Sequence, residues 1–253
     1  MPVKYFVEEQ SIVRKIWGKA DTVLFIFAGA AAEFALNKAV DWLYFTGKLP
    51  ADPLARLFST VTYSRQILFS TEEDAYYAIN QITAIHKHVE GARGAQIPDW
   101  AYRDVLFMLI DYTIRSFELL DRKLSLDEKQ QVFETFYKLG LHMGLRGLPQ
   151  NYTAWLTMRQ DHLEKNLQYS PLTADLFKQY RKHLGGPRYW LMCKVQALLV
   201  PARVKEQLKL KNGNLLNPLL YAYKLFAGSK LSRWFRDAIL PAKYKSQIVA
   251  MDS

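Results

Sequence analysis

One histidine in this sequence lies where an imidazole could hold a metal ion or a haem iron. Residues 74–91 have the apolar spacing of an amphipathic helix with one buried face. The apolar residues, mostly three or four apart, are Ala78, Ile79, Ile82 and Ile85. His86 lies on or beside that face, whereas His88 points nearly the opposite way. A neutral imidazole there could be an iron ligand, and the alternative is a core histidine bonded to a carbonyl group.

The other histidines add no further metal-ligand spacing. They are His142, His162 and His183, while His86 and His88 diverge on the predicted helix. Local spacing therefore argues against a metal held by several histidines. One axial histidine is enough for haem, however, because the porphyrin supplies the other four ligands. The sequence contains no glycine-rich phosphate loop, GxSxG motif or HExxH motif, so the sites that these motifs build are not expected.

A basic residue and a hydroxyl residue share one face of the preceding predicted helix. Asp52 and Pro53 predict its start, because aspartate is a favoured cap and proline suits the first helical position. The helix is expected to run to Phe69. Arg56 and Thr60 are four residues apart and therefore lie on the same face. The alternative for Arg56 is a surface ion pair with Asp52, and for Thr60 an ordinary helix position.

Glu33 follows the most apolar run of the chain. Residues 23–32 are apolar or small, but a bilayer span takes about 20 such residues, so a buried helix is predicted. The small residues 29–32 would let another helix or a flat cofactor approach closely. A buried carboxylate must be paired or protonated. Glu33 is therefore either a candidate base in a site or the partner of a lysine such as Lys38.

The elements that carry these residues are all expected to be helices. Glycine and proline lie mostly between long periodic segments, and few alternating stretches typical of strands occur. The predicted helices cover residues 9–20, 22–36, 40–45, 53–69, 74–91, 99–120, 126–142, 152–167, 173–184, 189–199, 201–210, 215–226 and 229–239. Asp21, either Ser70 or Thr71, and Ser125 are expected caps, and Gly185-Gly186-Pro187 predicts a strong stop. We predict an all-α fold, one single-domain, multi-helix bundle over residues 1–253 with its core over about 17–240.

The net charge of +10 is concentrated toward one end of the chain. Residues 201–253 contain ten Lys or Arg against three Asp or Glu, together with Trp234 and Phe235. Such a basic, aromatic segment is compatible with peripheral contact with an anionic membrane. The alternative is a solvated face that keeps an apolar protein soluble. We expect no nucleic-acid partner.

The single cysteine and the first residues bear on location. Cys193 cannot form an internal disulfide, which fits a reducing compartment, and it is expected to be a small core residue. Glu8 and Glu9 stand where a secretory signal would carry positive charge. The expected location is therefore cytoplasmic, with the membrane-peripheral alternative.

Taken together, the spaced motifs resemble a family of oxygenases. Asp52-Pro53, Arg56 and Thr60, followed by His86-x-x-Val89-x-Gly91 about 26 residues after Thr60, are similar to the latex-clearing proteins (rubber oxygenases) and the fungal MpaB enzymes. Later features that agree are Leu109-Ile110-Asp111 with Arg115 and Glu118, Gly144 with Gly147-Leu148-Pro149, and Leu199-Val200-Pro201 with Val204. The resemblance spans roughly residues 17–239, which is nearly the whole chain.

This resemblance implies a globin-like bundle around a buried haem pocket. It implies that His86 is the axial ligand of a haem b iron, with Val89 in the same motif and with Arg56 and Thr60 close to the haem. Arg56 could then offset a propionate or polarise bound oxygen, being a fixed cation. Glu33 is the candidate base on the distal side. The implied function is a haem b-dependent oxygenase that uses O2, bound opposite His86, on a small apolar substrate, terpenoid or polyisoprenoid-like or a lipid.

The chain departs from the family pattern at two places. Latex-clearing proteins carry a lysine just before the motif threonine, where this chain has Ser59. Many relatives carry a histidine in the long helix where Leu106 or Phe107 stands. Both departures concern the substrate and proton-transfer steps and leave the axial ligand in place. The alternative functions are a non-enzymatic haem-binding protein and a peripheral lipid- or membrane-binding helical protein, and the oligomeric state is left open.

Overall fold

Helices make up the regular structure of the chain, as its apolar spacing predicts. The computed structural model describes residues 3–211 and 216–226. Its helices are α1 (Ile12–Trp17), α2 (Ala20–Phe34), α3 (Val40–Phe45), α4 (Lys48–Ala51), α5 (Pro53–Phe69), α6 (Glu72–Arg93), α7 (Asp99–Leu120), α8 (Leu126–His142), α9 (Tyr152–Lys165), α10 (Pro171–Leu199), α11 (Ala202–Gln207) and α12 (Asn217–Phe226). Extended pairing in the described ranges is confined to two isolated bridges, Tyr5 with Thr71 and Asn37 with Leu167. The predicted all-α, single-domain bundle is confirmed.

Local capping chemistry starts several helices where the sequence predicts. Asp52 accepts a hydrogen bond from the Ala55 N–H at the start of α5, with a proline in the first turn. Thr71 accepts the Asp74 N–H at the start of α6. Ser125 forms a reciprocal capping box with Glu128 at the start of α8 (2.9 and 3.2 Å). Each such cap contributes about 1 kcal/mol, which fixes where the helix begins.

Several predicted helix boundaries are wrong, among them the cap at Asp21 and the stop at Gly185. Asp21 is not a cap: α2 begins at Ala20 after Lys19, and Asp21 lies in the first turn, where its charge favours the helix dipole. The predicted stop at Gly185-Gly186-Pro187 is a kink inside α10. Gly185 adopts φ 73° and ψ 168°, a conformation that glycine reaches without the strain of a side chain. The chain therefore changes direction there and resumes a helix at once.

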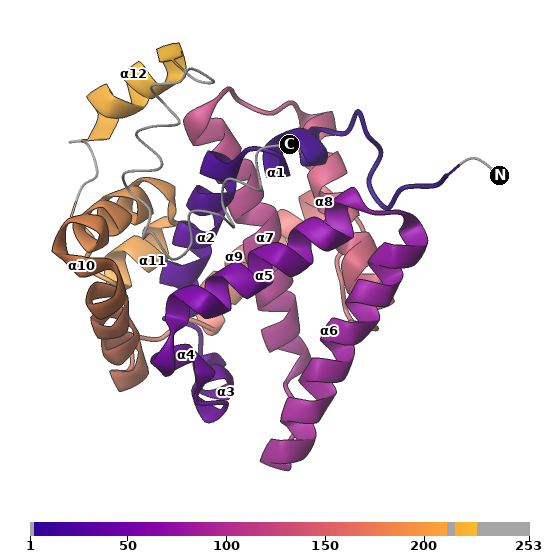
Figure 1. The fold of residues 1–253 in the computed structure, drawn as a ribbon, viewed down its shortest axis with the longest axis horizontal. Helices are drawn as coiled ribbons and strands as arrows, with labels where there is room; N and C mark the ends of the chain where they lie inside the picture. Colours follow the sequence, from indigo (N-terminus) through magenta and orange to yellow (C-terminus); the bar gives the residue numbers. More distant parts are fainter. Residues whose placement is uncertain (1–2, 212–215, 227–253) are drawn as a thin grey trace.

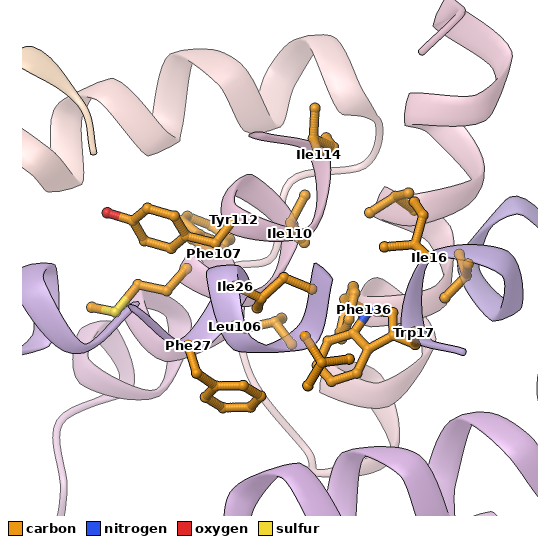
Figure 2. Packing of buried hydrophobic residues seen from close by; sticks show 14 of the residues in the cluster. Ile16, Trp17, Ile26, Phe27, Leu106, Phe107, Ile110, Tyr112, Ile114 and Phe136 are labelled. Carbon is orange, nitrogen blue, oxygen red and sulfur yellow. The ribbon is translucent and has the colours of Figure 1, made fainter. Parts of the chain in front are cut away.

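Helices α2 and α7 pack against each other at the centre of the bundle (Figure 1). Gly29 of α2 permits this, because a Cβ atom there would lie only 2.3 Å from Cδ1 of Tyr112 in α7. The close approach predicted for the small residues of α2 is thus made by another helix. Figure 2 shows the core around this contact, where Trp17, Phe107 and Phe136 are fully buried. Within the described residues, no helix combines the length and the apolar character needed to cross a membrane.

Helices α5 and α6 form a pair joined at Ser70 and Thr71 (Figure 1). They diverge from that connection, so Arg56 lies toward the far end of α5 and His86 toward the far end of α6. Arg56 and His86 therefore lie on two consecutive helices that are in contact with each other. The predicted helix over 229–239, Trp234, Phe235 and most of the basic segment 201–253 lie outside the described residues.

Cys193 differs from its prediction as a core residue. It is half-buried on the second part of α10. Burial raises the pKa of its thiol, which keeps it protonated at neutral pH.

Candidate functional site

His86 is a half-buried histidine with an unmet hydrogen-bonding group. Its Nδ1 is buried and has no hydrogen-bond partner in the part of the chain that the structure describes. The ring of Tyr102 meets the imidazole edge-on, with ring centroids 5.2 Å apart and an interplanar angle of 71°. His88 is exposed as predicted, but the predicted buried face of α6 is only partly correct: Ala78 and Ile79 are buried, whereas Ile85, next to His86, is exposed. The alternative of a core histidine bonded to a carbonyl group is not found among the described hydrogen bonds.

The electrostatic surroundings of His86 favour its neutral form. Burial lowers the pKa of the imidazole, the positive charge of Arg56 lowers it further, and the negative charge of Glu90 acts in the opposite direction. The net pKa lies below the usual value of about 6.5. A neutral imidazole is the form that can bind a metal, so His86 is ready for ligation at neutral pH.

Arg56 is held by hydroxyl groups of its own helix. Its Nη1 donates to the Ser59 Oγ and to the Thr60 Oγ1, both at 3.3 Å, and each hydroxyl donates to the Arg56 carbonyl oxygen. Burial lowers the pKa of the guanidinium, and the field of Tyr63 acts in the opposite direction. A partly desolvated cation whose described hydrogen bonds go to neutral hydroxyls favours an anionic ligand. Asp52 caps the helix, with His183 Nδ1 3.9 Å from its carboxylate.

These residues form one group, which we call the α5–α6 site: Arg56, Ser59, Thr60, His86 and Val89. After burial, the positive charge of Arg56 on α5 is the second influence that lowers the pKa of His86 on α6. Val89 is half-buried and lies one turn beyond His86 on α6. Ser59, which replaces the lysine of the latex-clearing proteins, contributes a hydroxyl to Arg56. The site thus comprises a cation with two hydroxyls on α5 and an unsatisfied imidazole with an apolar side chain on α6.

Glu33 belongs to a different cluster, on the central helices. Both of its carboxylate oxygens accept from the Arg159 guanidinium at 2.5 Å, and the Tyr112 hydroxyl donates to Oε2 at 2.8 Å. The predicted alternative, a pair between Glu33 and Lys38, is wrong, because the Lys38 ammonium donates to the Lys165 carbonyl oxygen at 2.6 Å. The carboxylate is buried and paired, as the physical rule requires, but its partner comes from α9.

Arg159 also bonds Asp111, which extends the cluster along α7. The Arg159 guanidinium donates to Asp111 Oδ2 at 3.0 and 3.2 Å, and Arg115 Nε donates to Oδ1 at 2.6 Å. The predicted pair of Asp111 with Arg115 is confirmed. Burial opposes the charge of Arg159, but the carboxylates of Glu33 and Asp111 raise its pKa well above the usual range. We call the buried part of this cluster the buried ion network: Glu33, Asp111, Tyr112 and Arg159. Arg115 is exposed and lies at its edge.

The sequence reading missed Arg159, although a signal for it exists. Tyr152, Trp155 and Leu163 mark the buried stripe of α9, and Arg159 stands four residues after Trp155 on that stripe. A charged residue on an apolar stripe must find a buried partner of opposite charge. That requirement identifies Arg159 as a paired residue without naming Glu33 as the partner.

A second polar cluster surrounds Asp104 on the same helices. Its carboxylate accepts from Asn37 at 2.7 Å and from Asn166 at 2.9 and 3.1 Å, and it contacts Nδ1 of His162. Leu106 and Phe107, the two positions compared with the relatives' histidine, are both buried, and Phe107 packs against the His162 ring. Across the described ranges, no three His, Cys, Asp or Glu side chains gather to hold a metal ion.

Comparison with known protein families shows that most of the chain matches one family model. The model of a family described as "ER-bound oxygenase mpaB/B'/Rubber oxygenase, catalytic domain" matches residues 14–230. This range includes every residue of the α5–α6 site and of the buried ion network. A comparison with curated proteins found no match.

Proposed function

Because the chain belongs to the family of mpaB and rubber oxygenase catalytic domains, we propose that it is a haem b-dependent oxygenase. The family is one of oxygenases, which makes the protein an oxidoreductase that uses O2 and an apolar substrate. The proposal adds the cofactor, its ligand and the substrate class. The substrate is a small apolar molecule, terpenoid or polyisoprenoid-like or a lipid.

The unsatisfied imidazole of His86 carries this proposal. A buried polar atom without a partner is uncommon in a folded protein and calls for an explanation such as a missing ion or ligand. An iron ion bound by this nitrogen would supply the missing partner, because a neutral imidazole binds a metal through the lone pair of its unprotonated ring nitrogen. The donor set therefore fits haem b, with His86 as the axial ligand. When bound, the haem supplies the redox chemistry with O2.

Arg56 and Thr60 contribute the polar part of the site. The guanidinium is the charge complement of a haem propionate, and it can hold the carboxylate through two parallel hydrogen bonds. Ser59 and Thr60 keep the guanidinium in one orientation through their bonds to Nη1. Val89 adds an apolar wall one turn from the imidazole. These roles orient the cofactor and keep water away from it.

The role of Glu33 as a distal base stays a prediction. Its two oxygens are engaged by Arg159 and by the Tyr112 hydroxyl, so accepting a proton would require one of those bonds to lengthen. Replacing Glu33 with Gln would keep the hydrogen bond from Tyr112 while removing the charge. Turnover that survives this change in a folded variant would remove Glu33 from the list of bases.

An absorption spectrum of the purified protein, titrated with haemin where needed, tests the proposal. We expect a Soret band in the wild type and its loss in His86→Ala, because the axial ligand is gone. His88→Ala is the matched control, since His88 is exposed on the same helix, and it should keep the band. A colourless wild-type protein that cannot be reconstituted with haemin would overturn the proposal.

Oxygen consumption separates an oxygenase from a haem carrier. The haem-loaded protein should consume O2 when terpenoid or fatty substrates are added, and His86→Ala should not. Retained haem with no consumption across such substrates would support the non-enzymatic alternative. Liposome co-sedimentation of the wild type and of variants with neutralised C-terminal lysines tests the membrane alternative, and location in the cytoplasm stays a prediction.

A further inference from the structure

Tyr102, in the first turn of α7, covers the imidazole of His86. The two rings meet edge-on at 5.2 Å, although the residues belong to different helices. Burial raises the pKa of the Tyr102 hydroxyl, and the charge of Glu90 raises it further, so the hydroxyl stays a hydrogen-bond donor. Tyr102 is the aromatic ring packed on this histidine among the described residues.

Glu90 holds Tyr102 in that place. It lies four residues after His86 on α6, and its Oε1 accepts from the Tyr102 hydroxyl at 3.2 Å. The same oxygen accepts from the Ile97 N–H at 2.8 Å, and the Glu90 carbonyl oxygen accepts from the Ala95 N–H at 3.2 Å. One residue thus fastens the turn between α6 and α7 to the helix that carries His86.

A metal-bound histidine needs its ring orientation fixed. Such histidines almost always donate their second ring N–H to a carboxylate or carbonyl oxygen, and that bond sets the orientation. Among the described residues, neither ring nitrogen of His86 has a carboxylate or carbonyl acceptor of this kind. The orientation must then come from packing, and the Tyr102 ring, fastened by Glu90, is the contact that can supply it.

We propose that Tyr102 and Glu90 are positioning residues that fix the His86 imidazole for its ligand by packing, in place of a hydrogen bond from the second ring nitrogen. Glu90 acts through Tyr102 and through the turn at Ile97, and neither residue touches the reacting atoms. The proposal rests on the proposed function for the identity of the ligand. The ring orientation itself can be measured without any ligand.

Two substitutions at Tyr102 separate ring packing from the hydrogen bond. Tyr102→Leu removes the ring, and we expect haemin to bind about tenfold more weakly, the size typical of a lost outer-shell contact. Tyr102→Phe keeps the ring edge and should restore most of the affinity. Glu90→Ala removes the acceptor of both the Tyr102 hydroxyl and the Ile97 N–H, so its haemin affinity should fall below that of Tyr102→Phe, whereas Glu90→Gln keeps an acceptor and should stay close to Tyr102→Phe.

The His86 ring signals in the haem-free protein give an independent readout. In spectra of the 13C-labelled imidazole, Tyr102→Leu should shift the His86 signals by removing the adjacent ring, whereas Tyr102→Phe should leave them near their wild-type positions. Glu90→Gln should lower the pKa of His86, because the charges of Glu90 and Arg56 act on it in opposite directions. The overall fold of each variant is checked by circular dichroism.

Tyr76 provides a matched control on the same helix. Its hydroxyl donates to Glu72 Oε1 at 3.0 Å, and its ring stacks on His142 at 4.0 Å, so it repeats the Tyr–Glu–His arrangement away from His86. Tyr76→Leu should leave haemin affinity and the His86 signals unchanged. The inference is overturned if Tyr102→Leu leaves both unchanged, or if Tyr76→Leu weakens haemin binding equally. A wild type without haemin binding would refute the proposed function, while the ring signals would still decide the positioning.

Discussion

The buried ion network and the α5–α6 site both place charge inside the bundle, but they satisfy that charge differently. In the network, Glu33 and Asp111 meet Arg159, and every one of these contacts comes from the chain itself. In the site, the described hydrogen bonds of Arg56 go to two hydroxyls, and Nδ1 of His86 has no partner in the described residues. The network therefore holds the helices together. In the site, by contrast, the imidazole nitrogen and the guanidinium charge are available to a ligand.

The largest expected effect comes from removing the cation of the buried ion network. Arg159→Met leaves the buried carboxylate of Glu33 without its counter-charge and leaves Asp111 with Arg115 alone, which should lower the free energy of unfolding by about 3–5 kcal/mol. Urea denaturation measures this loss. The control is Lys165→Ala, whose partner Asp161 is exposed, and it should cost less than about 1 kcal/mol. A loss for Arg159→Met as small as the control would mean that the network does not hold the helices together.

A smaller loss of folding stability is expected from a substitution at the contact between Tyr112 and Gly29 of α2. Gly29→Ala places a Cβ atom 2.3 Å from a Tyr112 ring whose hydroxyl is fixed by Glu33, so the ring cannot simply turn away. The resulting strain should lower the free energy of unfolding by about 1–3 kcal/mol, measured by thermal or urea denaturation.

Gly91→Ala is the matched control, taken from the helix of the α5–α6 site. A Cβ atom at Gly91 meets nothing within 4 Å, and alanine favours a helix interior over glycine. The free energy of unfolding should therefore rise by about 0.5–1 kcal/mol. Equal losses in both variants would contradict the difference in packing between the two regions.

In the α5–α6 site, substitution should not destabilise the haem-free protein. His86→Leu removes a buried nitrogen without a partner and adds apolar surface, so the free energy of unfolding should stay constant or rise by up to about 1 kcal/mol. Urea denaturation of the haem-free protein checks this. A loss greater than about 1 kcal/mol would indicate that His86 has a structural partner, and the contrast with Arg159 would disappear.

The smallest effect concerns the dependence of stability on pH. Because the pKa of folded His86 lies below its unfolded value, the unfolded chain binds more protons just below pH 6.5. This histidine therefore lowers stability as the pH falls through that window and has no such effect above it. Arg56→Gln removes a charge that lowers the pKa, so the His86 pKa should rise toward 6.5 and this loss should shrink.

An NMR titration of His86 measures that pKa directly. Lys48→Gln is a suitable control, because Lys48 is exposed on the preceding helix and should leave the His86 pKa unchanged. A His86 pKa that does not move in Arg56→Gln would show that the two residues of the site are not coupled.

Local sequence patterns were sufficient to predict the existence of most helices and roughly where each lies in the chain. Helix α7 runs from Asp99 to Leu120 as predicted, and the caps Asp52 and Ser125 form the bonds expected of them. The helix end predicted at Gly185 was wrong. Glycine permits a change of chain direction, but its presence does not determine whether a helix resumes after it. The sequence also predicted that Arg56 and Thr60 share one face of α5, because residues four apart in a helix lie on the same face.

The sequence by itself determined the helices, their caps and the half-buried place of His86, because each depends on residues within about one turn of one another. Tertiary structure alone decided that Glu33 meets Arg159, 126 residues away, and that Arg56 acts on His86 from a neighbouring helix. Those pairings follow from how the helices pack. Packing depends on the combined shape and burial of many side chains, which no local spacing specifies.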